Sequence, residues 1–177
     1  MVLQPSRERV APVDFRSARA RTISMPIAYL ALGANLGDRR RNIQSAVELL
    51  RATAGTSVTK VSSLHETAAV GGPAGSPAFL NAAAEVETSL EPAALLARLL
   101  EIERLLGRER REKWGPRTID LDVLLYDDRV VDESHLHIPH PLMHQRRFVL
   151  APLAEIAPGA IHPVLKRSVA ELLADLS

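Results

Sequence analysis

One short stretch, WGPRTIDLDVLLYDD at residues 114–128, constrains the fold of this chain more than any other. Its middle alternates between an apolar and a polar set, with Ile119, Leu121, Val123 and Leu125 in the first and Thr118, Asp120 and Asp122 in the second. Successive side chains of a β-strand point to opposite faces, so the alternation predicts a half-buried strand. The polar face of this strand carries two acids side by side, which requires an explanation.

The preceding residues predict an ordered series of strands and helices. Apolar runs or alternation indicate three more strands, and apolar residues at helical spacing indicate two helices. In chain order we expect a strand at residues 27–32, a helix with Ile43, Val47 and Leu50 on its apolar face, strands at residues 57–67 and 79–88, and a helix from Pro92 to Gly107 with Leu95, Leu99, Ile102 and Leu106 on its apolar face. With the strand around Asp120, the order is strand, helix, strand, strand, helix, strand.

This order is typical of a ferredoxin-like α+β fold (βαββαβ), an antiparallel sheet with both helices on one face. The face under the helices is then predicted to carry Leu80, Ala82, Ala84 and Val86 together with Ile119, Leu121, Val123 and Leu125. The other, open face is predicted to carry Asn81, Glu85, Asp120 and Asp122. The proline-punctuated residues after about 130 are expected to wrap around the sheet as a C-terminal extension.

Length and composition exclude several classes of protein. A chain of 177 residues is long enough for one domain with its own core. It has no cysteine, which excludes disulfides, cysteine–zinc sites and thiol catalysis. The apolar runs are too short to cross a bilayer and the net charge is only +1, so we expect a cytoplasmic protein that binds neither a membrane nor nucleic acid.

Residues 1–24 differ from the rest of the chain. Five arginines, two prolines and no sustained apolar period predict a disordered basic tail. Such a tail could be a targeting peptide or a nucleic-acid arm. Met25 stands directly before the first strand, which favours an upstream extension of a domain at residues 25–177.

The two acids suit a site for a metal ion and a nucleotide. Residues i and i+2 of a strand lie roughly 7 Å apart, where ionised Asp120 and Asp122 repel each other unless a cation is bound. Magnesium commonly takes one or two carboxylates and completes its shell with water and phosphate oxygens. Cationic residues, which phosphoryl transfer uses to neutralise charge, crowd the positions just before the pair: Arg108, Arg110, Arg111, Lys113 and Arg117. From the pair alone, two ordinary exposed acids remain an equal alternative.

Three other features have competing interpretations. Trp114, the only tryptophan, is either the anchor of a small cluster or a group that stacks on a planar substrate. The segment GANLGD at residues 33–38 matches neither nucleotide-binding loop motif and is predicted to form a turn, with Asp38 capping the next helix. Four histidines at positions 135, 137, 140 and 144 match no standard zinc pattern, so we favour a nucleotide contact by one of them over a zinc site.

Four segments together resemble one enzyme family. ALGANLGDR, FLNAAAEVETSL, KWGPRTIDLDVLLYDD and IPHPLMHQRRFVLAPLAEIAP are similar to 6-hydroxymethyl-7,8-dihydropterin pyrophosphokinases of folate biosynthesis, from about Ile27 to Pro158. The resemblance implies a ferredoxin-like core and an enzyme that moves the terminal pyrophosphate of ATP onto the pterin hydroxymethyl group and releases AMP. It also implies that Asp120 and Asp122 hold two magnesium ions, and we expect the enzyme to be a monomer.

The same resemblance implies a role for individual residues. The pterin is expected to lie between Trp114 and Phe148, with Thr67 and Asn81 bonded to its edge, backbone groups near Val70 helping, and Phe79 where many relatives have tyrosine. Arg108 and Arg117 are expected to engage the phosphates, and with the two acids they form the catalytic set. The expected nucleotide-binding residues are Glu103, Arg110, Lys113, Trp114, Arg117, Val123, His140 and Arg146.

Two other functions remain as alternatives. Paired acids on a similar sheet also hold two metals in nucleotidyl transferases and cyclases. Less favoured is an RNA-binding ferredoxin-like module, because the open face would carry acids and lacks the aromatic RNA-binding signature. For a pyrophosphokinase we expect direct in-line attack without a covalent enzyme intermediate, since the sequence offers no nucleophile with a base beside it.

Overall fold

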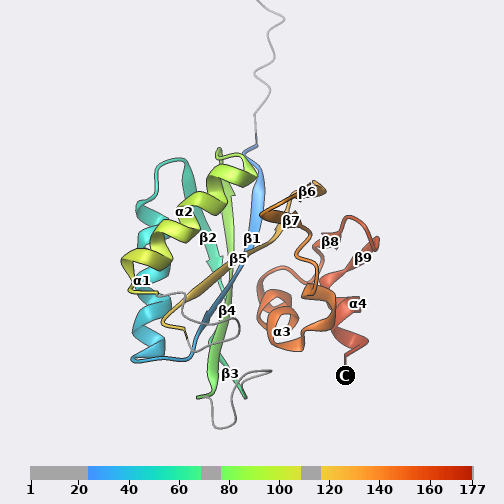
Figure 1. Cartoon of the computed structure of the whole chain (residues 1–177). Coiled ribbons are helices and arrows are strands. Elements are labelled where there is room, and N and C mark those ends of the chain that lie inside the picture. The colour runs from blue at the N-terminus through green and yellow to red at the C-terminus, as the bar shows by residue number, and fades with distance from the viewer. Residues whose placement is uncertain (1–23, 69–76, 109–116, 177) are drawn as a thin grey trace, which may run out of the picture.

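The computed structural model describes residues 24–68, 77–108 and 117–176 (Figure 1). Val70, Arg110, Lys113, Trp114 and the predicted tail up to residue 23 lie outside these ranges. The elements, in chain order, are β1 (Ile27–Ala34), α1 (Arg39–Ala52), β2 (Thr56–Val61), β3 (His65–Thr67), β4 (Phe79–Thr88), α2 (Pro92–Leu105), β5 (Asp120–Tyr126), β6 (Val131–Glu133), β7 (Leu136–Ile138), a short 3₁₀ helix η2 (Met143–Gln145), α3 (Arg147–Ile156), β8 (Ile161–His162), β9 (Arg167–Ser168) and α4 (Val169–Ala174).

The main sheet has the strand order β2-β4-β1-β5, with β3 paired to β4 beyond the end of β2, and every pairing is antiparallel. The register positions the polar residues of the site. Gly33 on β1 lies opposite Asn81 on β4 and opposite Asp120 on β5, and Ala31 lies opposite Asp122. Directly paired residues share a face of a sheet, so Asn81, Asp120 and Asp122 all point to the same side.

Helices α1 and α2 cover the opposite face (Figure 1). Their apolar residues pack on the alternating positions of the strands, in a core that includes Leu30 and Leu32 of β1, Leu99 of α2 and Leu121 of β5. The face predicted for β4 is confirmed, because Ala82, Ala84 and Val86 belong to this core and Leu80 packs against it. Truncating a buried leucine such as Leu99 to alanine typically costs about 2–5 kcal/mol.

The predicted position of Leu125 is wrong. The pairing of β1 with β5 shifts between Tyr29 and Leu30, so that Tyr29 lies opposite Leu125 and Leu30 lies opposite Val123. One extra residue in a strand reverses the alternation beyond it. Val123 packs in the core under α1 and α2, whereas Leu125 packs on the other side of the sheet, in a second core that includes Leu150 and Leu153.

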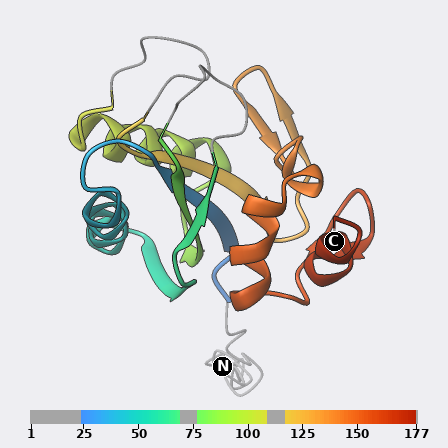
Figure 2. The same ribbon diagram turned by 90° about the horizontal axis from the view of Figure 1, so that it is seen from below.

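Helix α3 covers the face that was expected to be open (Figure 2). Val149, Leu150 and Leu153 are buried there against Ala83 of β4 and Leu125 of β5. The sequence did not predict this helix, because Pro152 stands inside it and lacks the N–H that a helix interior uses. Burial of its apolar side chains against the sheet outweighs the lost hydrogen bond.

Local signals for the first two helices agree with the structure. Asp38 is the N-cap of α1, and its carboxylate accepts from the N–H of Arg41 at 3.0 Å, as predicted. Pro92 occupies the first turn of α2, and Gly107, with φ of 78°, follows its end. In the described ranges, no helix is long and apolar enough to span a membrane.

Candidate active site

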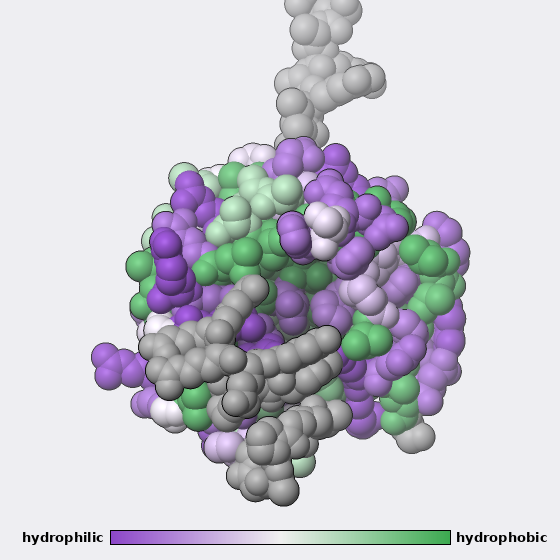
Figure 3. Space-filling model, viewed as in Figure 1, coloured by the Kyte–Doolittle hydropathy of each residue, from purple (hydrophilic) through white to green (hydrophobic). Residues whose placement is uncertain are grey.

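A cavity of about 590 Å³ lies on the α3 side of the sheet, within the size range of small-molecule sites. The strands β1, β4 and β5 form its floor, and residues 145–149 at the start of α3 form one wall. Figure 3 shows the molecule hollowed near its centre, with hydrophobic residues along the upper edge of the hollow and hydrophilic residues inside it. The cavity thus brings together several segments that are far apart in the sequence.

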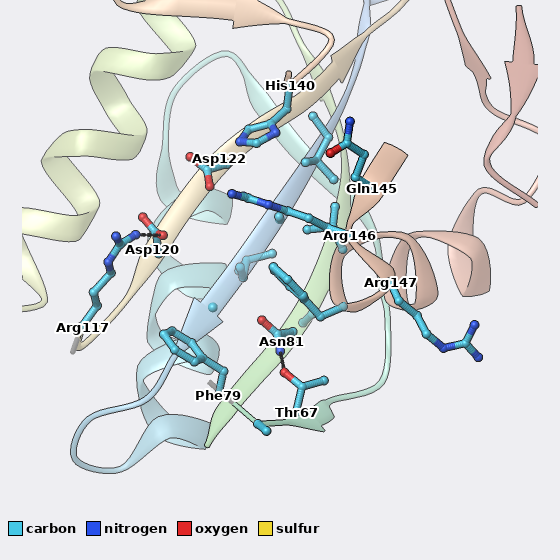
Figure 4. A pocket seen from close by; sticks show the side chains of 18 residues that line it. Thr67, Phe79, Asn81, Arg117, Asp120, Asp122, His140, Gln145, Arg146 and Arg147 are labelled. Carbon is cyan, nitrogen blue, oxygen red and sulfur yellow. Dashed lines mark hydrogen bonds and ion pairs between the residues drawn. The ribbon is translucent and has the colours of Figure 1, made fainter. Parts of the chain in front are cut away.

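Asp120 and Asp122 point from β5 into this cavity (Figure 4). Two arginines hold Asp120: Arg108 Nη1 lies 2.6 Å from its Oδ1, and Arg117 Nη1 donates to its Oδ2. The carboxylate of Asp120 is therefore fixed between two cations. Both arginines adjoin the acids, as the sequence predicted, and Arg117 itself lines the cavity.

The pKa of Asp122 is raised to about 6. Burial of its carboxyl is the largest cause, followed by repulsion from Asp120 and Glu103, while Arg108 and Arg117 offset part of the effect. A bound cation would remove this repulsion. Two neighbouring carboxylates that share excess negative charge therefore fit a magnesium ion, which takes its other ligands from water and phosphate. Among the described residues there is no group of three or more histidine, cysteine, aspartate or glutamate side chains that could hold a metal.

Glu103 lies behind the acids and does not line the cavity. Its side chain is almost fully buried, and its Oε1 accepts from the N–H of Leu121 at 2.7 Å and from Arg108 Nη1. Burial raises the pKa of Glu103, although both of these donors favour the charged form. Glu103 therefore orients Arg108 toward Asp120. Val123, another predicted nucleotide contact, is buried in the core under α1 and α2.

The other end of the cavity is less charged. Asn81 is buried, and its Nδ2 donates to Thr67 Oγ1 at 2.8 Å. Phe79 and Phe148 line the same cavity as this pair, and Figure 4 shows Phe79 close to Asn81. Gly33 faces the same space, and a Cβ there would lie 3.5 Å from Asn81 Oδ1 and 3.8 Å from the ring of Phe79. This end offers amide and hydroxyl groups beside two apolar ring faces, which suits a flat heterocycle.

His140 and Arg146 occupy the wall beside the two acids (Figure 4). Burial lowers the pKa of His140, and the nearby Arg146 lowers it further. The N–H of Leu142 lies 3.2 Å from His140 Nδ1, a contact that suits a neutral ring with Nδ1 as acceptor. The guanidinium of Arg146 lies 5.7 Å from the centre of the Phe148 ring, within cation–π range.

The structure brings together most of the predicted residues that it describes. Thr67, Phe79, Asn81, Arg117, Asp120, Asp122, His140, Arg146 and Phe148 line the cavity, and Arg108 reaches it through Asp120. Sequence reasoning missed Gly33, Gln145 and Arg147, which also line it. A glycine within an apolar strand and the polar run before Phe148 were the available signals, although Arg147 points away from the acids (Figure 4).

Comparison with known proteins identifies the family. The family model described as 7,8-dihydro-6-hydroxymethylpterin-pyrophosphokinase (HPPK) matches residues 29–158. The chain belongs to this family. Two curated relatives carry the name 2-amino-4-hydroxy-6-hydroxymethyldihydropteridine pyrophosphokinase: the Bacillus subtilis protein is 52% identical, with 73% of this chain and 77% of that protein covered, and the Aquifex aeolicus protein is 40% identical, with 83% and 90% covered.

Solved structures support the fold. An HPPK-DHPS in complex with substrates superposes with a TM-score of 0.66 at 15% identity, and Plasmodium falciparum HPPK-DHPS with pteroate superposes with a TM-score of 0.68 at 15% identity. Each comparison covers 85% of this chain but only 43% and 44% of those longer chains, respectively. The mixed α/β architecture with its antiparallel sheet is therefore that of these proteins.

Proposed function

We propose that this protein transfers the terminal pyrophosphate of ATP to the hydroxymethyl group of 6-hydroxymethyl-7,8-dihydropterin and releases AMP. One observation carries the proposal: a single cavity contains Asp122 and the arginine-paired Asp120, together with the hydrogen-bonded Asn81 and Thr67 and two phenylalanine rings. The first half suits a triphosphate and the second half suits a pterin. The names of the relatives that are 40–52% identical support the same reaction.

Asp120 and Asp122 are the residues that would hold magnesium, and we propose two ions. Bound there, magnesium would neutralise negative charge on the triphosphate. Asp120 and Asp122 supply two neighbouring carboxylates, and the repulsion from Asp120 and Glu103 that helps to raise the pKa of Asp122 is the kind of charge that a bound cation would offset. His140, which lies on the wall beside these acids, would contact the nucleotide as a neutral ring.

The side chains of this chain would act mainly by position and charge. The pterin hydroxyl oxygen attacks the β-phosphorus in line, the new O–P bond forms, and the bond from that phosphorus to the bridging oxygen of AMP breaks. The described cavity offers no nucleophile–base pair, so the attack is direct, and the hydroxyl proton passes to solvent or to a phosphate oxygen. Arg117 and Arg146 stabilise the charge that develops on the phosphate oxygens, and Glu103 keeps Arg108 in place beside them.

At the pterin end, Asn81 and Thr67 would bond the edge of the ring and Phe148 would stack on its face. We also infer that β1–β5 with α1 and α2 form a ferredoxin-like core within one domain at residues 25–177, followed by a C-terminal extension that carries α3. The position of α3 argues against the RNA-binding alternative, because the helix covers the face that such modules use.

The proposal is tested by nucleotide chromatography of purified protein incubated with ATP, magnesium and hydroxymethyl dihydropterin. A control without pterin measures background hydrolysis, and an Asp120→Asn variant tests the site. The expected result is AMP in amounts equal to the pyrophosphorylated pterin, only when pterin is present and strongly reduced in the variant. Free pyrophosphate would favour a nucleotidyl transferase or cyclase, and ADP or no product would overturn the proposal.

A further inference from the structure

Outside the cavity, one buried amide side chain connects the strands that carry the charged groups. Asn35 follows the end of β1 and is only 3% exposed. Its side-chain Oδ1 accepts from the backbone N–H of Arg117 at 2.7 Å, and its backbone N–H donates to the backbone carbonyl of Arg117 at 3.1 Å. The N–H of Leu36 reaches the same carbonyl at 3.2 Å. Both backbone polar groups of Arg117 are therefore held by the turn after β1.

The hydrogen bonds between Asn35 and Arg117 lie just beyond the end of the pairing between β1 and β5 and take its place there. The described ladder between β1 and β5 ends at Gly33 and Asp120, so Arg117 lies beyond it. A buried N–H without a partner costs about 1–3 kcal/mol, and the amide of Asn35 supplies the acceptor that the ladder no longer provides. The other end of the same amide, Nδ2, lies 3.4 Å from the carbonyl of Pro77, just before β4. The side chain of Asn35, just after the end of β1, is thus bonded to the residues just before β5 and β4.

A second amide reinforces the same place. Asn42 on α1 donates from Nδ2 to the carbonyls of Leu36 and Thr118, each at 3.0 Å. The N–H of Asn42 in turn donates to the carbonyl of Asp38, the N-cap of the helix, at 2.9 Å. The backbone of residues 117 and 118 is therefore fixed from both the turn and the helix.

The anchored backbone carries a side chain of the site. Arg117 donates to Asp120 Oδ2 and lines the cavity, but its long side chain is flexible by itself. Fixing the backbone at residue 117 limits where the guanidinium can lie. Neither Asn35 nor Asn42 is among the residues that line the cavity, so both can act only through what they hold.

We propose that Asn35, assisted by Asn42, is a positioning residue that holds Arg117 in register with Asp120 for pyrophosphoryl transfer. This inference rests on the proposed function. It assigns a role to the GANLGD turn, which otherwise only connects β1 to the cap of α1. A displacement of about 1 Å at a reacting centre can lower a rate by roughly 100-fold, so a misplaced Arg117 should mainly reduce kcat.

Kinetics of four variants test the proposal. Asn35→Leu keeps a similar volume and removes the two side-chain hydrogen bonds, to the N–H of Arg117 and to the carbonyl of Pro77. Asn35→Asp keeps the acceptor for Arg117, and Asn42→Leu removes the second anchor. Gln44→Leu makes the same amide-to-leucine change at an exposed position of α1 and is the control. We expect kcat to fall roughly 10- to 100-fold in Asn35→Leu, less in Asn42→Leu and Asn35→Asp, and not in the control, with smaller changes in the KM for ATP.

A second mutation separates positioning from general destabilisation. The effect of Asn35→Leu on kcat is measured in the wild type and in an Arg117→Ala variant, which completes a double-mutant cycle. If Asn35 acts through Arg117, then Asn35→Leu should lower kcat by less than about 3-fold once Arg117 is absent. An equal loss in both backgrounds would overturn the proposal, as would an Arg117→Ala variant that keeps full kcat.

Hydrogen exchange at the Arg117 amide gives a readout that does not need activity. This amide should be protected in the wild type, exposed in Asn35→Leu and protected again in Asn35→Asp. Unchanged protection in Asn35→Leu would overturn the proposal even if activity fell. If the wild type makes no pterin-dependent AMP, the proposed function fails and the catalytic part of this inference fails with it, whereas normal AMP production without effects at residue 35 overturns the inference alone.

Discussion

The substitution Asp122→Asn should stabilise the metal-free protein and abolish most of its activity. The environment of Asp122 in the wild type destabilises its ionised carboxylate, since burial and repulsion from Asp120 and Glu103 raise its pKa from 3.8 to about 6. Asparagine has nearly the same shape and no charge. The substitution therefore removes a cost to folding while it removes a carboxylate that we propose binds magnesium.

The size of the stability change follows from the pKa. Each pKa unit corresponds to 1.36 kcal/mol, so the shift from 3.8 to about 6 amounts to about 3 kcal/mol. The folded state binds more protons than the unfolded state between these two values, and the wild-type free energy of unfolding therefore falls as the pH rises through this window. The variant should match the wild type near pH 4, gain with rising pH, and exceed the wild type by up to about 3 kcal/mol above pH 7.

Urea unfolding in the presence of a chelator, measured from pH 4 to pH 8, tests this reasoning. The exposed Asp128 lies just beyond β5, and Asp128→Asn is the matched control, with little change in stability expected at any pH. Pyrophosphoryl transfer by Asp122→Asn should fall by roughly 100-fold or more, in line with the loss of one group that stabilises developing charge. An Asp122→Asn variant that is less stable than the wild type at neutral pH would refute the argument, because the ionised carboxylate would then be a favourable part of the fold.

Three further predictions concern other contacts. Hydrogen bonds from the N–H and hydroxyl of Ser63 hold the pKa of Glu155 below its usual value. Ser63→Ala should therefore lower the free energy of urea unfolding by less than about 1 kcal/mol above about pH 4.5. This difference should vanish in acid, where Glu155 is protonated. Gly33→Val would project a side chain toward Asn81 and should raise the KM for pterin roughly 10-fold or more in steady-state kinetics, with little change in the KM for ATP. Phe148→Ala should raise the KM for pterin by about 10-fold, because it removes the ring proposed to stack on the substrate.

Each of these has an outcome that would contradict it. A stability loss in Ser63→Ala that persists at pH 3 would show that the carboxylate of Glu155 is not responsible. Equal losses of pterin and ATP affinity in Gly33→Val would indicate a general distortion of β1. An unchanged KM for pterin in Phe148→Ala would place the substrate elsewhere in the cavity.

Much of the sheet and several site residues could be predicted from local patterns. The alternation of β4, the cap of α1 by Asp38 and the shared face of Asp120 and Asp122 depend on periods of two or on neighbours a few residues away. Helix α3 could not be predicted in this way. Its internal Pro152 is a local signal against a helix, and only burial of apolar side chains against the sheet outweighs it.

Other features depended on contacts between distant segments. The shift of register at Leu30 moves Leu125 to the second core, and no residue of β5 alone indicates that shift. Glu103 matched a nucleotide-contacting position, yet its carboxylate is buried between Arg108 and the backbone of Leu121. A buried charge requires partners from whichever elements pack around it, and the sequence does not say which these are.

By itself, the sequence determined that two aspartates share one strand face beside a cluster of cations, because side-chain direction in a strand follows from a period of two residues. The tertiary structure alone decided what surrounds them. Antiparallel pairing places Asn81 and Asp120 on the two strands that flank Gly33, and the start of α3 closes the far side of the cavity with Phe148 and the N-cap residue Arg146. Register and packing join residues that are far apart in the chain, so the energies that fix them come from contacts that no local pattern contains.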